Sequence, residues 1–206
     1  MLMRYITGLV SQITGFFAQF PLFFPLNMIV LPLLAWLFGI KVKEAESNIK
    51  SYKSFQALFT RKLKPGLRPI SKQAVVVSPC DGTLVACEDL AEQELLEVKK
   101  QRYRPQTLLN LEKAPNKGVV MSLYLAPYND HRFHMPRTAI IRSLTHIPGP
   151  LYPVDTRFQA LMPQVMLRNE RVIVECETEK KRWYMVAVGA LNVGKIEFPW
   201  MPDFKT

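Results

Sequence analysis

RVIVECETEKKRWYMVAV, residues 171–188, carries the clearest structural signal in the chain. Its two ends, residues 171–176 and 183–188, are rich in β-branched and aromatic residues, a composition typical of strands. The charged segment between them, residues 177–182, is typical of a turn. We therefore expect a β-hairpin here and an antiparallel sheet at the centre of the fold.

Outward from this hairpin, short strand-like runs outnumber helical ones. We expect further strands at residues 74–77, 83–87, 119–125, 138–147 and 193–197. The first two flank the turn PCDG (residues 79–82) and are expected to pair as a hairpin. A helix is expected at residues 91–100, where acidic residues come first and lysines last, and one helical turn is expected within residues 102–112. This order predicts an α+β fold with a mainly antiparallel sheet.

The charge balance favours a polyanionic partner. The chain has 27 Lys and Arg against 17 Asp and Glu, a formal charge of +10, which suits an acidic membrane or a nucleic acid. A solvated basic surface is the simpler alternative. We expect no nucleic-acid partner, because the aromatic residues lie mainly in the apolar N-terminus rather than among the basic residues. The three cysteines cannot all pair and form no CxxC, so they are expected to be free thiols in a reducing compartment.

The N-terminal segment is apolar throughout. Residues 5–40 contain no charged side chain, and Pro21, Pro25 and Pro32 interrupt the run. We expect two short helices that lie in one leaflet of a membrane, in preference to one spanning helix; a helical hairpin buried in the protein's own core is the alternative. Residues 1–41 are thus expected to be a membrane-associating segment. Residues 41–64 are expected to form a basic amphipathic helix at the membrane surface, with apolar residues at helical spacing and charges that include Arg61.

Two histidines in one proline-bounded loop are the best candidates for chemistry. His131 and His134 lie in PYNDHRFHMP (residues 127–136). No metal is expected, because a third ligand and an HExxH motif are both absent from the sequence around them. Acid–base work requires an orienting carboxylate, and Asp81 in the PCDG turn is a candidate, although a turn aspartate is the simpler interpretation. No GxSxG motif marks a nucleophile.

Six motifs, taken in order, resemble those of the phosphatidylserine decarboxylase family. They are FQALFTRKLKPGLRPI (55–70), SPCDG (78–82), PYNDHRFHMP (127–136), HIPGPLYPV (146–154), RNERV (168–172) and VGALNVGKI (188–196). The resemblance covers about residues 42–197 and identifies residues 42–206 as part of a catalytic domain of that family.

The resemblance implies a proenzyme that cleaves itself. In the family, a serine in a Leu-Gly-Ser-Thr motif attacks the preceding peptide carbonyl and becomes a pyruvoyl group, the cofactor that converts phosphatidylserine to phosphatidylethanolamine and CO2. Carried onto this sequence, Asp81 is the orienting acid and His134 the base. His131 is associated with the decarboxylation, as proton donor or substrate contact. Asn129 and Asp130 replace the family's usual Asp and aromatic pair, which leaves the exact roles of Asp130 and His131 open.

The remaining expectations concern context. The 206 residues contain no LGST motif and finish with FPWMPDFKT, which suggests a C-terminally truncated fragment that is inactive alone and needs a complementing C-terminal chain. The expected partners are an anionic phospholipid membrane and the lipid substrate phosphatidylserine, with a homodimer left open. The expected location is the cytoplasmic face of a bacterial inner membrane. The alternative function is a non-catalytic module that binds acidic lipids through its basic face.

Overall fold

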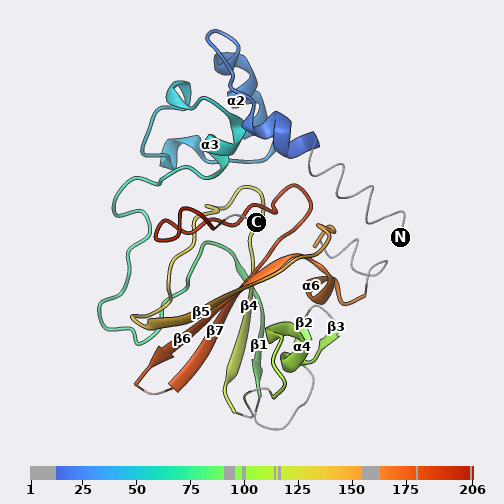
Figure 1. The fold of residues 1–206 in the computed structure, drawn as a ribbon. Helices are drawn as coiled ribbons and strands as arrows, with labels where there is room; N and C mark the ends of the chain where they lie inside the picture. Colours follow the sequence, from blue (N-terminus) through green and yellow to red (C-terminus); the bar gives the residue numbers. More distant parts are fainter. Residues whose placement is uncertain are drawn as a thin grey trace. The chain divides into compact units, whose positions relative to one another are not determined.

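The computed structural model describes residues 13–90, 96–98, 101–113, 115, 117–154, 163–179, 181–204 and 206. These residues form helices and antiparallel sheets together, so the α+β class is confirmed (Figure 1). The chain forms two compact units that interleave in sequence. The helix–loop unit comprises residues 15–84 and 123–138, and the sheet unit comprises the described residues of 1–14, 85–122 and 139–206. The expected functional boundary at residue 41 stays a prediction.

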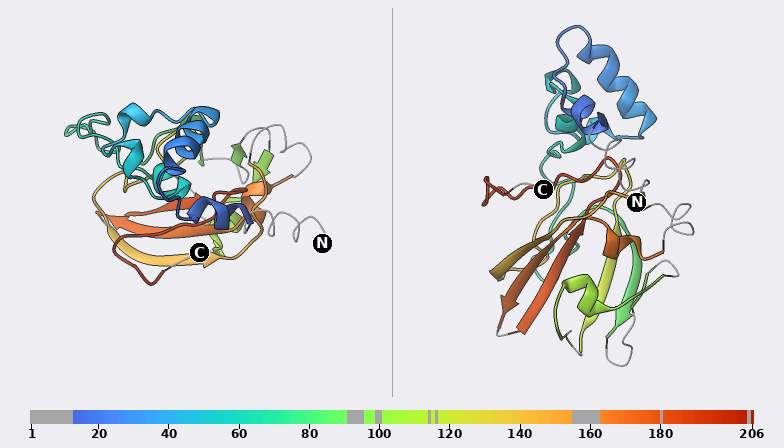
Figure 2. Two further views of the ribbon diagram at one scale, coloured as in Figure 1. Left: turned by 90° about the horizontal axis from the view of Figure 1, so that it is seen from above. Right: turned by 45° about the vertical axis from the view of Figure 1, so that its right-hand side comes forward.

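The sheet unit is built on three antiparallel strands in the order β5-β6-β7 (Figure 2). These strands are β5 (Ile140–Ile147), β6 (Arg171–Thr178) and β7 (Lys181–Val188). The predicted β6–β7 hairpin is confirmed, and its ladder runs from Arg171↔Val188 to Thr178↔Lys181, so the turn is tighter than predicted. The central strand supplies the core, since Val172, Val174 and Cys176 are fully buried.

Smaller strand pairs complete the β structure. Strand β1 (Thr83–Asp89) pairs with β4 (Val119–Tyr124), and β2 (Leu96–Val98) pairs antiparallel with β3 (Gln101–Tyr103). Two short helices accompany them, α4 (Pro105–Leu109) and α6 (Val165–Arg168). The expected strands at residues 83–87, 119–125 and 138–147 and the single helical turn within 102–112 are therefore confirmed, with small shifts of their ends.

The helix expected at residues 91–100 is wrong where the structure describes it. Residues 96–98 form β2 and pair with β3. Tyr103, opposite Leu96 in this ladder, is almost completely buried, so packing of β3 favours the extended pairing. The charge order that suggested a helix is a weak preference that tertiary packing overrides. The other residues of that range, 91–95 and 99–100, lie outside the described residues.

Two of the expected strands, at residues 74–77 and 193–197, do not form. Residues 74–77 are irregular, and Val75 and Val76 are 72% and 51% exposed. The predicted hairpin between residues 74–77 and 83–87 is wrong, because β1 pairs with β4 instead. At residues 193–197 the structure has only an isolated bridge, Ala190↔Val193. β-branched composition favours a strand only where a neighbouring strand is available.

The helix–loop unit contains the helical residues 15–19, then α2 (Asn27–Leu37), η1 (Val42–Glu44), η2 (Ile49–Ser51) and α3 (Phe55–Phe59). Its core is formed by Leu31 and Ala35 of α2 with Ile40 and Leu58. Helix α2 continues through Pro32, so this proline does not break it. Within the described part of the chain, none of the helices has the length and hydropathy needed to cross a membrane.

The single amphipathic helix expected over residues 41–64 is wrong. Asn48, Tyr52 and Ser54 have extended backbone angles, which divide the segment into η1, η2 and α3. Ser54 ends the extended stretch and caps α3 by accepting a hydrogen bond from Ala57 N at 3.2 Å. The segment is consequently folded against α2, with Leu58 fully buried.

The RNERV motif has a structural explanation in the sheet unit. Asn169 is fully buried, and its amide bonds Tyr152 N, Tyr152 O and Gly189 O at 2.8–3.1 Å. The guanidinium of Arg171 donates to the carbonyls of Thr107, Leu108 and Leu167. These two side chains bond six backbone groups between them, so packing accounts for both residues.

Candidate active site

Two loops far apart in sequence are joined by backbone pairing in the helix–loop unit. Cys80 and Phe133 form an antiparallel bridge. Beyond the bridge, on its Pro79 and His134 side, His134 N donates to Pro79 O at 2.8 Å and Val77 N donates to Pro136 O at 2.9 Å. The SPCDG turn and the histidine loop therefore lie side by side, which is necessary if Asp81 and His134 belong to one site.

Gly82 fixes the position of Asp81 within its turn. Its φ of +149° is a conformation that residues with a side chain rarely adopt. A Cβ at this position would lie 2.7 Å from Tyr124 O, at the end of β4. Only glycine allows the chain to pass so close to β4 directly after Asp81.

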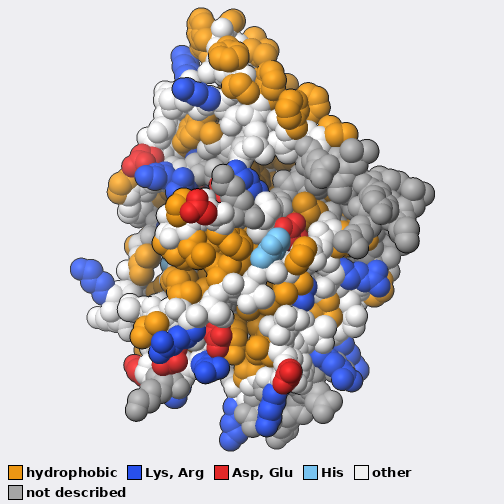
Figure 3. Space-filling view, in the orientation of Figure 1, with side chains coloured by type: hydrophobic (Ala, Val, Ile, Leu, Met, Phe, Trp, Pro, Cys, Tyr) orange, Lys and Arg blue, Asp and Glu red, His pale blue; other side chains and the backbone are white. Residues whose placement is uncertain are grey.

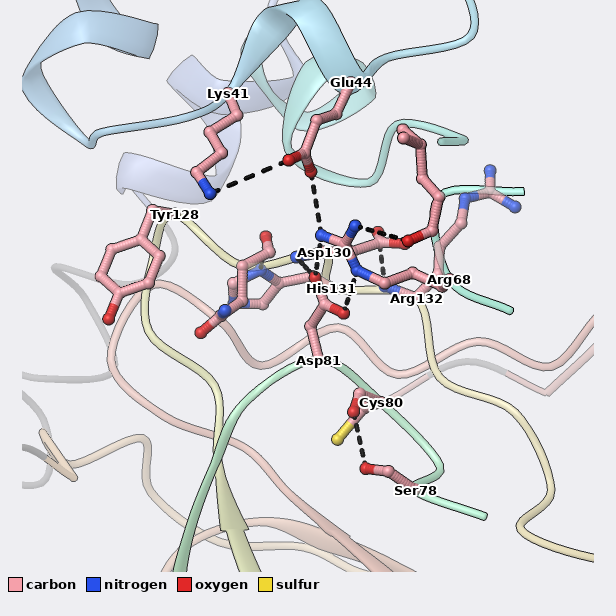
Figure 4. Close-up of polar contacts among 12 residues, drawn as sticks. Lys41, Glu44, Arg68, Ser78, Cys80, Asp81, Tyr128, Asp130, His131 and Arg132 are labelled. Atoms are coloured by element: carbon pink, nitrogen blue, oxygen red, sulfur yellow. Dashed lines mark hydrogen bonds and ion pairs between the residues drawn. The ribbon is translucent and has the colours of Figure 1, made fainter. Parts of the chain in front are cut away.

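The Asp81 carboxylate is held by three donors. Arg68 Nε donates to Oδ1 at 2.7 Å, Arg68 Nη2 donates to Oδ2 at 2.9 Å, and Asp130 N donates to Oδ2 at 3.3 Å. Figure 4 shows the carboxylates of Asp81 and Glu44 on opposite sides of the Arg68 guanidinium, whose bond to Glu44 is 2.9 Å long. The hydrogen bonds from Arg68 lower the pKa of Asp81 below its ordinary value, against the opposing effect of burial. Asp81 is therefore an anion at neutral pH.

His134 is exposed and its ring is directed to a local partner. Nδ1 lies 2.9 Å from Met135 O. Because a carbonyl can only accept, Nδ1 carries the proton and Nε2 carries the lone pair of the neutral ring. The structure brings the loops of Asp81 and His134 together, but the two side chains share no hydrogen bond. Their expected roles as orienting acid and base stay predictions.

His131 lies in an apolar environment. Its ring stacks on Phe59 with centroids 3.9 Å apart, and Nδ1 lies 3.2 Å from Asn129 O. Burial lowers the pKa of His131 to about 4, and the charge of Arg61 acts in the same direction. At neutral pH the ring is thus uncharged, with Nδ1 protonated and Nε2 able to accept a hydrogen bond.

Two arginines of the FTRKLKPGLRPI segment belong to the site, which the sequence analysis did not predict. Arg68 binds Asp81, and Arg61 is only 2% exposed instead of lying on a membrane-facing helix as expected. Arg61 Nη2 donates to Tyr128 O at 3.5 Å, while Nε and Nη1 have no partner among the described residues. The charge of Arg61 lowers the pKa values of Asp81 and His131. The only sequence signal for either arginine is its place in a motif that precedes the turn.

Asp130 and Cys80 differ from Asp81 in the direction of their pKa shifts. Burial raises the pKa of Asp130, although Asp130 Oδ1 accepts a hydrogen bond from Arg132 N. Burial and the adjacent Asp81 raise the pKa of the Cys80 thiol to about 11, so Cys80 is protonated and a poor nucleophile at neutral pH. The third histidine, His146, lies in the sheet unit, where Nε2 bonds Glu170 at 2.8 Å.

The site fits the chemistry that forms a pyruvoyl group from a serine. That chemistry needs a base with an available lone pair and a carboxylate that stays ionised. The exposed Nε2 of His134 and the anionic Asp81 meet these requirements on adjacent loops. Within the described ranges, no three His, Cys, Asp or Glu side chains are grouped so that they could hold a metal ion.

The comparisons with known proteins agree on one family. A family model described as phosphatidylserine decarboxylase matches residues 55–203. The phosphatidylserine decarboxylase proenzyme of Shewanella amazonensis is 35% identical, over 93% of this chain and 69% of the relative. Those of Nitrosococcus oceani and Halorhodospira halophila are 40% and 38% identical, over 82% and 79% of this chain and 57% of each relative. The matched part of this chain spans between 57% and 69% of the length of these three relatives.

His131 should titrate far below an ordinary histidine. We expect its ring to protonate with a midpoint of about 4 instead of 6.5, measured by NMR of the ring protons from pH 3 to 8. The unfolded chain takes up this proton first, so the free energy of unfolding should fall as the pH drops from 6.5 toward 4. The variant Phe59→Ala, which opens one face of the ring to water, should raise the midpoint. A midpoint near 6.5 in the unaltered chain would contradict the burial of His131.

Proposed function

Because the chain belongs to the phosphatidylserine decarboxylase family, we propose that it supplies the acid–base residues of a phosphatidylserine decarboxylase proenzyme. The complete enzyme would cleave itself and then convert phosphatidylserine to phosphatidylethanolamine and CO2. The observation that carries this proposal is the backbone pairing of Cys80 with Phe133, which keeps the loops of Asp81 and His134 adjacent. Substrate and reaction are taken from the family, whose members are longer than the part matched here.

His134 acts as the base in self-cleavage. Its Nε2 accepts the proton of the serine hydroxyl as that oxygen attacks the preceding peptide carbonyl. The ring then carries a positive charge, which is stabilised by a nearby anion. Asp81 is that anion, because the Arg68 hydrogen bonds keep its pKa low.

In the decarboxylation, the chain's contribution is to contact and orient the substrate. A bound pyruvoyl group supplies the carbonyl that withdraws electrons from the breaking bond between Cα and the carboxylate. His131 is neutral and stacked on Phe59, so we assign it to a substrate contact through Nε2 in preference to proton donation as an imidazolium ion. Its fixed ring plane suits a positioning contact.

The apolar surface of the helix–loop unit is proposed to rest in one leaflet of an anionic membrane. Figure 3 shows hydrophobic side chains gathered over the part of the surface where α2 lies in Figure 1. These side chains are between 49% and 78% exposed: Phe16, Phe17, Phe20, Phe23, Phe24, Leu26, Ile29, Leu33, Trp36 and Leu37. So many exposed apolar groups on one short stretch indicate an interaction surface.

The buried face of α2 contributes Leu31 and Ala35 to the core of its own unit, which leaves the outer face available for lipid. Since phosphatidylserine is itself a bilayer lipid, this surface would keep the site near its substrate. The relatives compared above come from bacteria, so the cytoplasmic face of the inner membrane is the proposed location.

Self-cleavage should depend on His134. The test joins the 206-residue chain to the part of the Shewanella amazonensis relative that it does not span, and follows the appearance of two chains by gel and mass spectrometry. His134→Ala should slow cleavage by about 100-fold or more, the contribution of a positioned base. The control His146→Ala, altered in the sheet unit, should cleave normally. Equal cleavage by His134→Ala and the unaltered protein would instead favour a non-catalytic lipid-binding module.

Membrane binding should depend on the apolar face of α2. Trp36→Ser should weaken binding to vesicles of phosphatidylethanolamine and phosphatidylglycerol by about tenfold, because one large side chain leaves the lipid. Trp200→Ser is the matched control: Trp200 is 50% exposed in the sheet unit and should not alter binding. Sedimentation with the vesicles at low and high salt measures both variants. Equal weakening by the two variants, or none by Trp36→Ser, would refute the assignment of this surface.

A further inference from the structure

We propose that Arg68 is a positioning residue for self-cleavage, which holds the Asp81 carboxylate in the orientation from which it can accept a hydrogen bond from Nδ1 of His134. This inference rests on the proposed function of Asp81 and His134. It adds a residue to that machinery and explains how a carboxylate in an irregular turn keeps one orientation.

The geometry of the Arg68–Asp81 pair supports orientation as well as charge. Nε and Nη2, on one edge of the guanidinium, bind the two different oxygens of Asp81 at 2.7 and 2.9 Å. Two parallel hydrogen bonds fix the plane of a carboxylate, whereas a single donor leaves it able to rotate. Asp81 is the more enclosed partner, since its side chain is 13% exposed against 45% for Arg68.

The pair leaves one acceptor position for His134. Each carboxylate oxygen can accept about two hydrogen bonds. Among the described residues, Oδ2 accepts from Arg68 Nη2 and Asp130 N, whereas Oδ1 accepts only from Arg68 Nε. Oδ1 therefore has one lone pair left, on a turn whose backbone is bonded to the histidine loop.

The hydrogen bond from His134 Nδ1 to Met135 O can be replaced with little loss of free energy. Its Nδ1 donates to Met135 O, the carbonyl of the next residue, in an exposed position. Water can replace that local bond, because the ring and the carbonyl are accessible. Loss of that local bond frees the Nδ1 N–H, and the proposal requires the exposed side chain to rotate so that Nδ1 donates to Asp81 Oδ1.

Arg68 is itself held from the other side. Its Nη2 bonds Glu44 Oε2 at 2.9 Å, and Nη1 bonds Leu67 O at 3.2 Å. Glu44 is in turn fixed by its backbone, because Glu44 O accepts from Lys64 N at 2.9 Å. The guanidinium is thus clamped between two carboxylates, and Glu44→Gln should loosen it without removing it.

The pKa that a titration of Asp81 measures depends on the charged and titratable groups around its carboxylate. Arg68 and Arg61 lower its pKa. The other charged or titratable groups around this network are Glu44 with its partner Lys41, Asp130 with Arg132, His131 and the Cys80 thiol. Removing Arg68 takes away the largest of these effects and should shift the titration of Asp81 upward.

The first measurement uses the 206-residue chain alone and needs no reaction. The Asp81 carboxyl carbon is titrated by NMR in the unaltered chain, in Arg68→Lys and in Arg68→Ala. We expect the pKa of Asp81 to rise in both variants, and more in Arg68→Ala. Arg68→Lys keeps the charge and serves as the folded comparison if Arg68→Ala is unstable. An unchanged Asp81 titration in Arg68→Lys and Arg68→Ala would overturn the inference.

The second measurement follows self-cleavage against pH in the joined protein described above. Arg68→Ala should slow cleavage about 10- to 100-fold, the loss found at metal sites when a residue that orients a ligand is removed. It should also move the acid limb of the pH–rate profile to higher pH. Arg68→Lys should recover part of the rate. Arg142→Ala is the matched control, because Arg142 makes the same two-bond contact with Glu177, at 3.1 and 3.0 Å, in the sheet unit. It should change neither rate nor profile.

The two proposals fail differently. Normal cleavage by His134→Ala would refute the proposed function, whatever Arg68 does. Cleavage that requires His134 but proceeds in Arg68→Ala at the normal rate and with the normal pH profile would refute the positioning role alone. A slower rate with an unmoved acid limb, shared equally by Arg142→Ala, would also refute it, because general destabilisation then explains the loss.

Discussion

The antiparallel bridge between Cys80 and Phe133 is the contact on which the site depends. It joins a turn to a loop about fifty residues later in the chain. The backbone bonds from His134 N and Val77 N extend the pairing on one side of the bridge, and Asp130 N bonds the Asp81 carboxylate on the other. Without this pairing, Asp81 and His134 would lie on independent irregular segments. Gly82 contributes from the other side, since its backbone approaches β4 more closely than a side chain would allow. Function is thus placed on loops whose positions are fixed by backbone bonds.

Two arginines create different protonation states within one small region. Arg68 binds Asp81 and keeps it ionised, while burial and the charge of Arg61 keep His131 neutral. Neighbouring groups with separated pKa values are what acid–base chemistry at one pH requires. The guanidinium of Arg61 is almost fully buried. Its positive charge interacts with the side chains of Asp81 and Asp130, and these electrostatic interactions offset part of the cost of burying it.

The sequence predicts the fold where local pattern and long-range pairing agree. The β6–β7 hairpin is an example, because both strands and their turn are contiguous. Residues 74–77 are β-branched but form no strand, and residues 96–98 have helical charge order but pair with β3. Asp81, His131 and His134 were predictable because their motifs resemble a family. The contacts of Arg61 and Arg68 could not be predicted, because a basic residue in a basic segment is expected to be solvent-exposed unless the position of its acidic partner is known.

The central claim is that the SPCDG turn and the histidine loop are one hydrogen-bonded unit, and amide hydrogen exchange tests it directly. The donors are the amides of His134, Asp130 and Val77, which bond Pro79 O, Asp81 Oδ2 and Pro136 O. The account predicts that all three are protected and that they open together, with similar opening free energies. Exchange of the three amides at the rate of an unstructured peptide, while β6 stays protected, would contradict it.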